Sequence, residues 1–217
     1  MDYAELSVCT NFTFLTGASH AEELVTQAKL EGLAAIGIAD RNTLAGVVRA
    51  HVAARDLGLR LLVGARLVTR EGVEIIAYPQ DRAAYGRLCK LLTLGNRRAP
   101  KGECHLDLED LLGALDGHCL IAMPAFSAPT SCVAGEGHGG GEQKRRLFEA
   151  ALSRLQARFA GSLWIALTPG YRGDEALHRA EIAQLAARTG VPLIATNDVL
   201  YHTPARRPLQ DLLTCIR

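Results

Sequence analysis

The charged residues that could do chemistry in this sequence come directly after hydrophobic stretches of strand length. Asp40 and Arg41 follow one such stretch, Arg66 follows the next, and Asp198 follows the last. The carboxyl ends of parallel strands meet at one edge of a sheet, so we expect these side chains to lie close together. Carboxylates placed in this way can bind a divalent cation or pair with the guanidinium groups of arginines.

Smaller side chains occupy the corresponding places around the first predicted strand. Ser7, Cys9 and Thr16 lie in or just after it, and Leu200 lies two residues beyond Asp198. A thiol is a nucleophile only where its surroundings lower its pKa. Cys9 could be such a thiol, but a buried cysteine that packs as a small apolar residue is the simpler interpretation.

Strand-like stretches alternate with segments of helical periodicity along the chain. After a short first strand near Leu6 and Val8, the predicted strands lie at 33–39, 59–63, 73–78, 119–123, 162–167 and 191–196. The predicted helices lie between them and after the last strand, and the first three are expected to be capped by Ser19, by Asn42 or Thr43, and by Asp81. A glycine-rich stretch at 135–141 predicts a surface loop.

This alternation is typical of an α/β fold with parallel strands. About seven strand–helix units in succession favour a compact barrel over an open doubly wound sheet. No G-x-G-x-x-G sequence follows a strand, so nothing indicates dinucleotide binding.

The composition excludes several classes of protein. The chain has 217 residues, 48% of them hydrophobic, and a formal net charge of +1, so it is not a globally basic nucleic-acid binder, although a local basic groove stays open. Aromatic residues make up only 5%, too few for a stacking surface for single strands. No apolar run reaches the roughly 18 residues of a membrane span, and no signal peptide is evident. Six scattered cysteines favour a chain with reduced thiols in the cytoplasm.

Four segments resemble, in the right order, the motifs of the polymerase-and-histidinol-phosphatase (PHP) domain. They are Leu6–Ser19, Ile38–Gly46, Val63–Arg66 and Ala195–Tyr201. Within the first two, Thr10–Leu15 and Asp40–Asn42 resemble the error-prone branch of bacterial polymerases that are similar to the DNA polymerase III alpha subunit. The resemblance covers almost the whole chain, and four ordered motifs are far more specific than one.

The resemblance implies a distorted (β/α)7 barrel of the PHP type. It also implies that residues 1–217 form a single PHP domain, an N-terminal fragment of a longer polymerase. In the metal-binding members of the family, a cluster of histidine, aspartate and glutamate holds several metal ions. Such a centre activates water and neutralises phosphate during phosphoester hydrolysis.

This sequence departs from the family at most of the positions that the resemblance implies for metal ligands. Asp40 and Asp198 keep the character of a ligand. The other positions hold Ser7 and Cys9 for histidines, Thr16 for an acid, Arg41 for a histidine, Arg66 for an acid and Leu200 for a histidine. We therefore expect a degenerate site with no metal and no catalytic residue in this fragment, in which Arg41 or Arg66 pairs with Asp40 or Asp198.

The function implied for the parent protein is error-prone, DNA-directed DNA synthesis in DNA repair and damage-induced mutagenesis. The polymerase site and its Mg²⁺ are expected beyond residue 217, and this fragment is expected to be a structural scaffold. The implied partners are the rest of the polymerase chain, DNA, other mutagenesis proteins and the sliding clamp, with no membrane. The alternatives are an active metal-dependent phosphoesterase or 3′–5′ exonuclease, and a separate interaction module.

Other groups of residues have simpler interpretations than a site. A zinc site is conceivable at two Cys–His pairs, but their spacing matches no common finger. Two arginine pairs could contact a nucleic-acid backbone, but solvated surface arginines are more common. The four pairs are Cys104–His105, His118–Cys119, Arg97–Arg98 and Arg206–Arg207.

Overall fold

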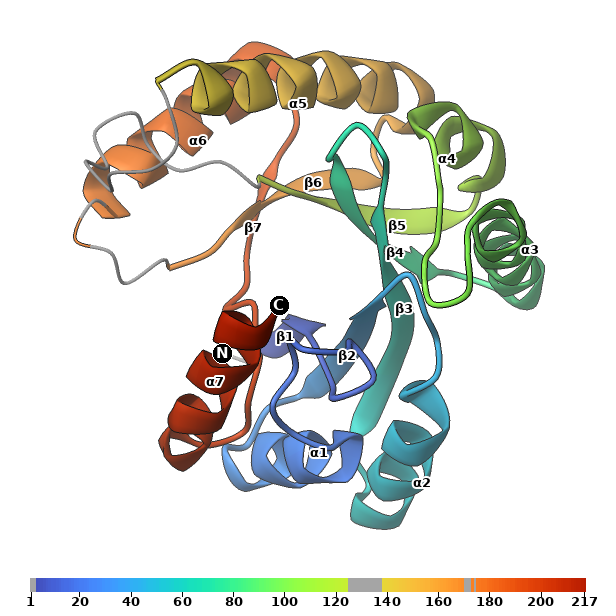
Figure 1. Ribbon diagram of the computed structural model, residues 1–217, viewed down its shortest axis with the longest axis vertical. Coiled ribbons are helices and arrows are strands. Elements are labelled where there is room, and N and C mark those ends of the chain that lie inside the picture. Colours follow the sequence, from blue (N-terminus) through green and yellow to red (C-terminus); the bar gives the residue numbers. More distant parts are fainter. Residues whose placement is uncertain (1–2, 125–137, 170–172, 174) are drawn as a thin grey trace. The chain divides into compact units, whose positions relative to one another are not determined.

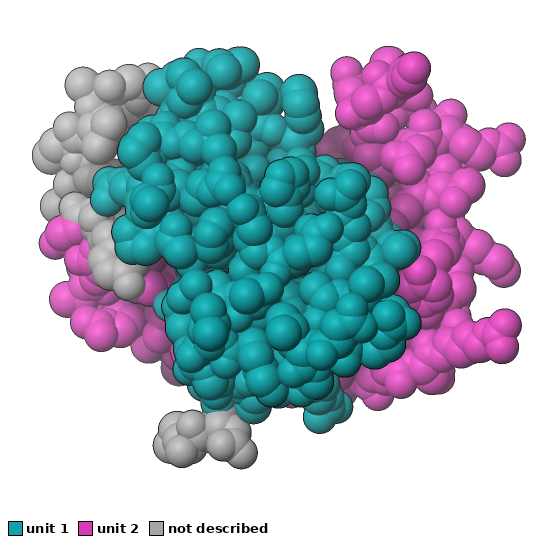
Figure 2. All heavy atoms as spheres, turned by 90° about the horizontal axis from the view of Figure 1, so that it is seen from below, with its two compact units in different colours: residues 1–66, 196–217 teal, residues 67–195 magenta. Residues whose placement is uncertain are grey.

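A computed structural model of the chain describes residues 3–124, 138–169, 173 and 175–217. The chain divides into two compact units, which Figure 2 shows in teal and magenta. Unit 1 contains residues 1–66 and 196–217, and unit 2 contains residues 67–195. Each predicted site residue belongs to unit 1.

Unit 1 begins with two strand–helix pairs and receives the end of the chain (Figure 1). Its elements are β1 (Ala4–Val8), α1 (Ala21–Leu30), β2 (Ala35–Arg41), α2 (Val47–Leu57), β3 (Arg60–Val68), whose last two residues lie in unit 2, the short 3₁₀ helix η1 (Pro204–Arg206) and α7 (Arg207–Ile216).

Helix α1 begins one residue later than its sequence predicts. His20 is the N-cap, and its backbone N–H donates to the Glu23 carboxylate at 2.9 Å, as in a capping box. Ser19 was expected to cap this helix, and that prediction is wrong. The Ser19 hydroxyl instead lies 2.7 Å from Nδ1 of His202 and accepts the His202 backbone N–H at 3.0 Å. Ser19 therefore ties the start of α1 to the last segment of unit 1.

Helix α2 also begins later than its sequence predicts. Gly46 is its N-cap, so the prediction of Asn42 or Thr43 is wrong. The Thr43 hydroxyl accepts the backbone N–H of Ala45 at 3.1 Å, which stabilises the turn before the helix rather than the helix itself. Helix α2 ends at Leu57, and its C-cap Gly58 has a left-handed φ of 62°, which suits a residue without a Cβ.

The three strands of unit 1 run parallel, and their register places the motif residues. Strands β2 and β3 pair from Ala35↔Arg60 to Arg41↔Arg66. Arg41 and Arg66 are therefore opposite each other where the two strands end. The segment after residue 196 runs beside β1. Cys9 N–H donates to the Val199 carbonyl at 2.9 Å, and Val199 N–H donates to the Ser7 carbonyl at 2.7 Å. The first and last motifs are therefore neighbours in space.

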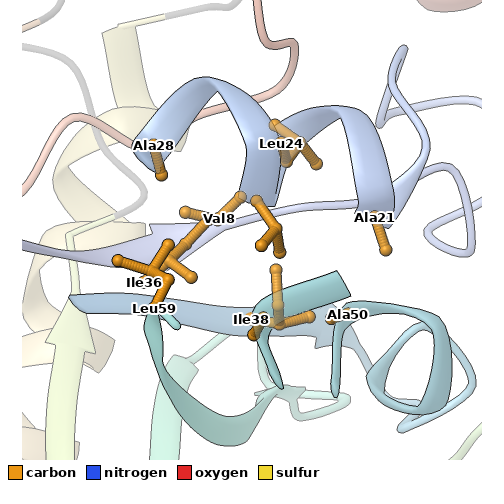
Figure 3. Packing of buried hydrophobic residues seen from close by; sticks show 10 residues of the cluster. Val8, Ala21, Leu24, Ala28, Ile36, Ile38, Ala50 and Leu59 are labelled. Atoms are coloured by element: carbon orange, nitrogen blue, oxygen red, sulfur yellow. The ribbon is translucent and has the colours of Figure 1, made fainter. Parts of the chain in front are cut away.

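A hydrophobic core fixes these strands against the helices of unit 1 (Figure 3). Val8 from β1 and Ile38 from β2 meet Leu24 from α1, and all three are almost fully buried. Small side chains let the helices approach closely, because Ala21 of α1 and Ala50 of α2 have no exposed surface. Apolar residues recur every three or four positions along α1, which explains why this segment is a helix with one buried face.

Unit 2 contains the remaining helices and strands. They are β4 (Glu74–Pro79), α3 (Arg82–Arg98), α4 (Leu108–Ala114), β5 (His118–Met123), α5 (His138–Phe159), β6 (Leu163–Leu167), α6 (Glu175–Thr189) and β7 (Leu193–Ala195). The predicted cap of α3 is confirmed, since Asp81 accepts the backbone N–H of Ala84 at 2.7 Å. Unit 2 buries leucines of its helices, such as Leu88 and Leu152, and isoleucines of its strands, such as Ile76 and Ile165.

In unit 1, β1 pairs with β2 and β2 pairs with β3; in unit 2, β4 pairs with β5, β5 with β6 and β6 with β7. The expectation that all strands run parallel is wrong for β4 and β5, which are antiparallel. No helix separates β3 from β4. The backbone N–H of Thr69 donates to the Val73 carbonyl at 3.0 Å, and Gly72 with a φ of 81° completes this tight turn.

The other predicted strands and helices are confirmed, although β3 runs to Val68 where the sequence predicted an end at residue 63. Residues 135–137 of the glycine-rich stretch lie outside the described residues, and the loop prediction is wrong for residues 138–141, which belong to α5. None of the helices within the described residues is both long and apolar enough to cross a lipid bilayer.

Candidate functional site

Three of the predicted site residues meet in one hydrogen-bonded group. The Arg66 guanidinium forms an ion pair with the Asp198 carboxylate, and the same Nη2 donates to the Ser7 hydroxyl at 2.7 Å. The Ser7 hydroxyl in turn donates to Oδ1 of Asp198 at 2.9 Å. The expected pairing of a strand-end arginine with a strand-end aspartate is therefore confirmed for Arg66 and Asp198.

The backbone of Asp198 adopts a conformation that is unusual for a residue with a side chain. Its φ is 53°, in the left-handed region. The residues on either side are fixed: Asn197 N–H donates to Glu5 at 3.0 Å, and Val199 pairs with β1. The surrounding hydrogen bonds thus hold a strained turn, and this turn presents the Asp198 carboxylate to Arg66.

Asp40 lies in a separate pocket made of neutral donors. Its Oδ1 accepts the backbone N–H of Thr10 at 2.7 Å and the hydroxyl of Thr13 at 2.8 Å, and its Oδ2 accepts the hydroxyl of Thr10 at 2.8 Å. Only 1% of Asp40 is exposed. Burial raises the pKa of this carboxyl above its ordinary value, although the two threonines act in the opposite direction.

Gly46 makes room for this pocket. A Cβ at residue 46 would lie 2.5 Å from Oδ2 of Asp40 and 2.7 Å from Oγ1 of Thr10, both shorter than van der Waals contact. The start of α2 can therefore approach the carboxylate only because residue 46 has no side chain.

Cys9 is buried beside these groups, with 4% of its surface exposed. Burial raises the pKa of its thiol to about 12, and the negative charges of Asp40 and Asp198 act in the same direction. A thiol with so high a pKa is protonated at neutral pH and is a poor nucleophile. The prediction that Cys9 is a buried, packed residue is confirmed.

The structure places the other predicted positions at the rim of the site. Arg41 is exposed, and its backbone N–H donates to the Thr13 hydroxyl at 3.0 Å. The Thr16 hydroxyl accepts a hydrogen bond from the guanidinium of Arg217 at 3.0 Å. Leu200 contributes its backbone carbonyl, which accepts the N–H of Ala18 at 2.8 Å.

Glu5 is a buried carboxylate that the sequence analysis missed. It is 2% exposed and accepts hydrogen bonds from the backbone of Ser7, the Tyr3 hydroxyl, the Thr196 hydroxyl, and the backbone and side chain of Asn197. Burial and the neighbouring Glu5 raise the pKa of the Tyr3 hydroxyl well above its ordinary value. Glu5 therefore joins β1 to the segment that carries Asp198.

A metal centre of the kind known in related folds needs several neutral imidazoles and free carboxylate oxygens in one place. Within the described residues, no three side chains of His, Cys, Asp or Glu come together in a way that could hold a metal ion. Both oxygens of Asp40 accept hydrogen bonds, and Oδ1 of Asp198 faces Arg66 and Ser7. This donor set does not fit a multinuclear centre.

The other residue groups noted in the sequence are engaged in local structure. Arg98 pairs with Asp110 at 2.6 Å, and Arg206 pairs with Glu23 at 2.6 Å. His118 is buried, and burial lowers the pKa of its imidazole. The cysteines of the described segments are free thiols.

Comparison with known proteins gives relatives of much greater length. The chain is 50% identical over 220 residues to an error-prone DNA polymerase of Rhodopseudomonas palustris (strain BisB5), which covers 99% of this chain and 18% of that relative. It is 46% identical over 221 residues to an error-prone DNA polymerase of Brucella abortus, covering 99% of this chain and 19% of the relative. The chain thus spans about a fifth of the length of these relatives.

Two solved structures share the fold at low sequence identity. A proposed metal-dependent phosphoesterase from Bifidobacterium adolescentis has a TM-score of 0.59 at 16% identity, over 93% of this chain and 88% of that one. An amidohydrolase from Chromobacterium violaceum, solved with sulfate and no metal, has a TM-score of 0.58 at 17% identity, over 91% of this chain and 87% of that one. The α/β fold of the PHP type that the motifs predict is therefore confirmed.

The family model described as the PHP domain matches residues 5–168. This match begins at β1 and includes the strand ends that carry Asp40 and Arg66. Together with the shared fold and the long relatives, it settles the family: this chain belongs to the PHP domain family.

Proposed function

We propose that this chain is the N-terminal PHP domain of an error-prone, DNA-directed DNA polymerase, and that it acts there as a structural scaffold. The relatives named above carry that activity in their names, and the chain matches them over 99% of its length. DNA synthesis itself, with its catalytic residues and its Mg²⁺, belongs to the part of the parent protein outside these 217 residues. The fragment alone is proposed to be catalytically inactive.

The observation that carries the scaffold proposal is the ion pair between Arg66 and Asp198. A guanidinium beside a carboxylate supplies the positive charge that a metal ion would otherwise supply, and it needs no exchangeable ligand. Only 14% of the Arg66 side chain is exposed, so this charge belongs to the interior of unit 1. The result is a fixed internal contact between β3 and the segment after residue 196.

We propose that this chain has a degenerate PHP site. Its positions are Ser7, Cys9, Thr16, Asp40, Arg41, Arg66, Asp198 and Leu200. Their present contacts support stability rather than hydrolysis. Asp40 fixes the loop after β1 through Thr10 and Thr13, and Asp198 fixes Arg66. Both oxygens of Asp40 accept hydrogen bonds, and Oδ1 of Asp198 is engaged by Arg66 and Ser7, which supports a structural role for the two carboxylates.

The proposed partners and location are those of the whole polymerase to which this chain is proposed to belong. The partners are the rest of the polymerase chain and, through it, DNA during repair of damage and damage-induced mutagenesis. Other mutagenesis proteins and the sliding clamp are partners of the whole polymerase rather than of the site in this domain. The proposed location is the cytoplasm, where the free thiols of the chain would stay reduced.

Release of nucleotides from a 3′ end tests the scaffold proposal. Labelled single-stranded and primed DNA is incubated with the 217-residue chain and with its Asp40→Asn/Asp198→Asn variant, in Mn²⁺ and in Zn²⁺. We expect no release by either protein, and lower stability of the variant because its ion pair and hydrogen bonds are weakened. Release by the parent chain that disappears in the double variant would contradict the scaffold role and support an active phosphoesterase or exonuclease.

The polymerase assignment has its own test. Extension of a primer opposite a damaged template is measured with the full-length protein that carries this sequence and with the 217-residue chain. We expect extension by the full-length protein only. Failure of a folded full-length protein to extend the primer in Mg²⁺ would contradict the assignment.

A further inference from the structure

Helix α7 presents a continuous row of apolar side chains that the described chain leaves open. Leu209, Leu212, Leu213 and Ile216 recur every three or four residues, so they lie on one face. Leu209 is 39% exposed, Leu212 is 56% exposed and Ile216 is 61% exposed. None of the 10 residues of α7 is buried within the described structure.

The other helices of unit 1 differ in this respect. Helix α1 buries Leu24 and Val25 against the strands, and α2 buries Ala50 and Ala54. An amphipathic helix is normally stabilised by burial of its apolar face, because helix propensity alone is too weak for so short a segment. Since α7 lacks that burial here, its apolar face is suited to a surface outside the described residues.

The opposite face of α7 has the polar character of an ordinary solvated surface. Arg207 and Asp211 lie 3.9 Å apart on one side, and Gln210 donates to the Thr214 hydroxyl at 2.9 Å. Helix α7 is therefore amphipathic, with one apolar face and one polar face, and is not apolar on every side.

Another exposed apolar residue, Phe14, belongs to the loop after β1, which contacts the end of α7. Arg217 donates to Thr16, which fixes the end of the helix to the loop after β1. Two residues earlier in that loop, Phe14 is 83% exposed, and Leu15 has a left-handed φ of 56°. Phe14 therefore adds one exposed apolar side chain to the loop that holds the end of α7.

We propose that the apolar face of α7, made of Leu209, Leu212, Leu213 and Ile216, is a docking surface for another part of the same parent polypeptide. The inference rests on the proposed function, because it needs the longer chain. The relatives supply the argument for this occupant, since the matched region is only 18% of one and 19% of another. Most of such a protein lies outside this fragment and can supply the apolar partner.

Hydrogen exchange of the amides of α7 tests this docking surface. It is measured in the 217-residue chain and in the full-length protein, each with no substitution, with Leu212→Glu and with Thr214→Glu. Thr214 is on the polar face, two residues from Leu212, so both substitutions add one negative charge near the same helix end. Leu212→Ala is the milder variant for the case in which the full-length Leu212→Glu protein does not fold.

We expect the full-length protein to exchange the α7 amides at least about tenfold more slowly than the 217-residue chain. Leu212→Glu and Leu212→Ala should remove that protection in the full-length protein, while Thr214→Glu should leave it. In the 217-residue chain, the substitutions at 212 and 214 should have the same small effect. Equal effects at both positions in the full-length protein would overturn the proposal.

A dimer of the 217-residue chain that Leu212→Glu dissociates would also overturn it, because the face would then bind a second copy. Primer extension by the same full-length preparations separates the two proposals. A full-length protein with protected α7 amides but no primer extension would contradict the polymerase assignment alone. Primer extension without protection of α7 would contradict the docking surface alone.

Discussion

Two carboxylates of unit 1, Asp40 and Asp198, are compensated in different ways for the water that they lose on folding. Asp40 is 1% exposed and is held by a backbone amide and two threonine hydroxyls. Asp198 keeps 35% of its side chain exposed and is held by the guanidinium of Arg66 and the hydroxyl of Ser7. The deeper carboxylate thus has neutral donors, and the shallower one has a charged partner.

The difference shows two ways in which a carboxylate at a strand end can be satisfied, either by neutral hydrogen-bond donors or by a guanidinium group. A buried carboxylate is costly unless hydrogen bonds or an opposite charge compensate for the lost water. The threonines compensate Asp40 locally, within the loop after β1. Arg66 compensates Asp198 across two distant parts of the sequence, because they lie 132 residues apart. Each contact can be removed separately, which makes the comparison testable.

The largest effect is expected for Asp40→Ala. This change leaves the backbone N–H of Thr10 and two hydroxyls without their acceptor in a buried place, so it should lower the free energy of unfolding by ~3–5 kcal/mol. Urea denaturation of the 217-residue chain measures this loss. Asp56→Ala is the control, because Asp56 is an exposed residue of α2, and it should change the stability by less than about 0.5 kcal/mol. Equal effects of the two substitutions would contradict the role given to Asp40.

A smaller loss is expected for Arg66→Met. Asp198 then loses its charged partner, but water can reach the exposed part of its side chain. The free energy of unfolding should therefore fall by about 2–3 kcal/mol. The double variant Arg66→Met/Asp198→Asn should recover part of that loss, since no charge is left alone. A double-mutant cycle with a coupling of about 1–2 kcal/mol is the expected result. Strict additivity would show that the ion pair contributes nothing.

Gly46→Ala tests the pocket of Asp40 from the side of the helix. The new Cβ would approach Oδ2 of Asp40 to 2.5 Å. We expect the free energy of unfolding to fall by about 1–2 kcal/mol, because the start of α2 must shift. The control is Gly86→Ala in α3, where a Cβ meets nothing within 4 Å and should stabilise the helix by ~0.5–1 kcal/mol. A stabilising effect at Gly46 as well would contradict the close approach described here.

The last prediction concerns pH. Burial raises the pKa of Asp40 in the folded chain above the ordinary 3.8, so the folded state holds this proton more tightly than the unfolded state. The contribution of Asp40 to stability should therefore be greatest below pH 3.8 and should fall as the pH rises from 3.8 through the folded pKa. Titration of the Asp40 carboxyl carbon by NMR measures the shift directly. A midpoint below 3.8 would mean that the threonine donors outweigh burial.

The sequence predicted most strands and helices because their apolar residues repeat with a clear period. It failed at Ser19 because the deciding contact is not local, and at the start of α2 because Thr43 binds the amide of Ala45 in the turn before the helix. Ser19 binds His202, 183 residues away, so no cap motif near α1 reveals it. The antiparallel pair of β4 and β5 was missed for a related reason, because alternation of strands and helices does not fix strand direction when one connection is a tight turn.

The site was predicted in part. The ion pair of Arg66 with Asp198 followed from the charges at the strand ends, but the partners of Asp40 did not, because threonine hydroxyls carry no distinctive spacing. Glu5 was missed because a charged residue beside Leu6 suggests a solvent-facing position. Its distance of two residues from Ser7 was the available signal, since alternate residues of a strand share a face.

The central claim is that the strand ends of unit 1 hold hydrogen bonds and an ion pair in place of a metal centre. Elemental analysis of the purified chain after dialysis against Zn²⁺ or Mn²⁺, compared with the Asp40→Asn/Asp198→Asn variant, tests it most directly. We expect no stoichiometric metal in either protein. A full equivalent or more of zinc or manganese in the parent chain, lost in the double variant, would contradict it.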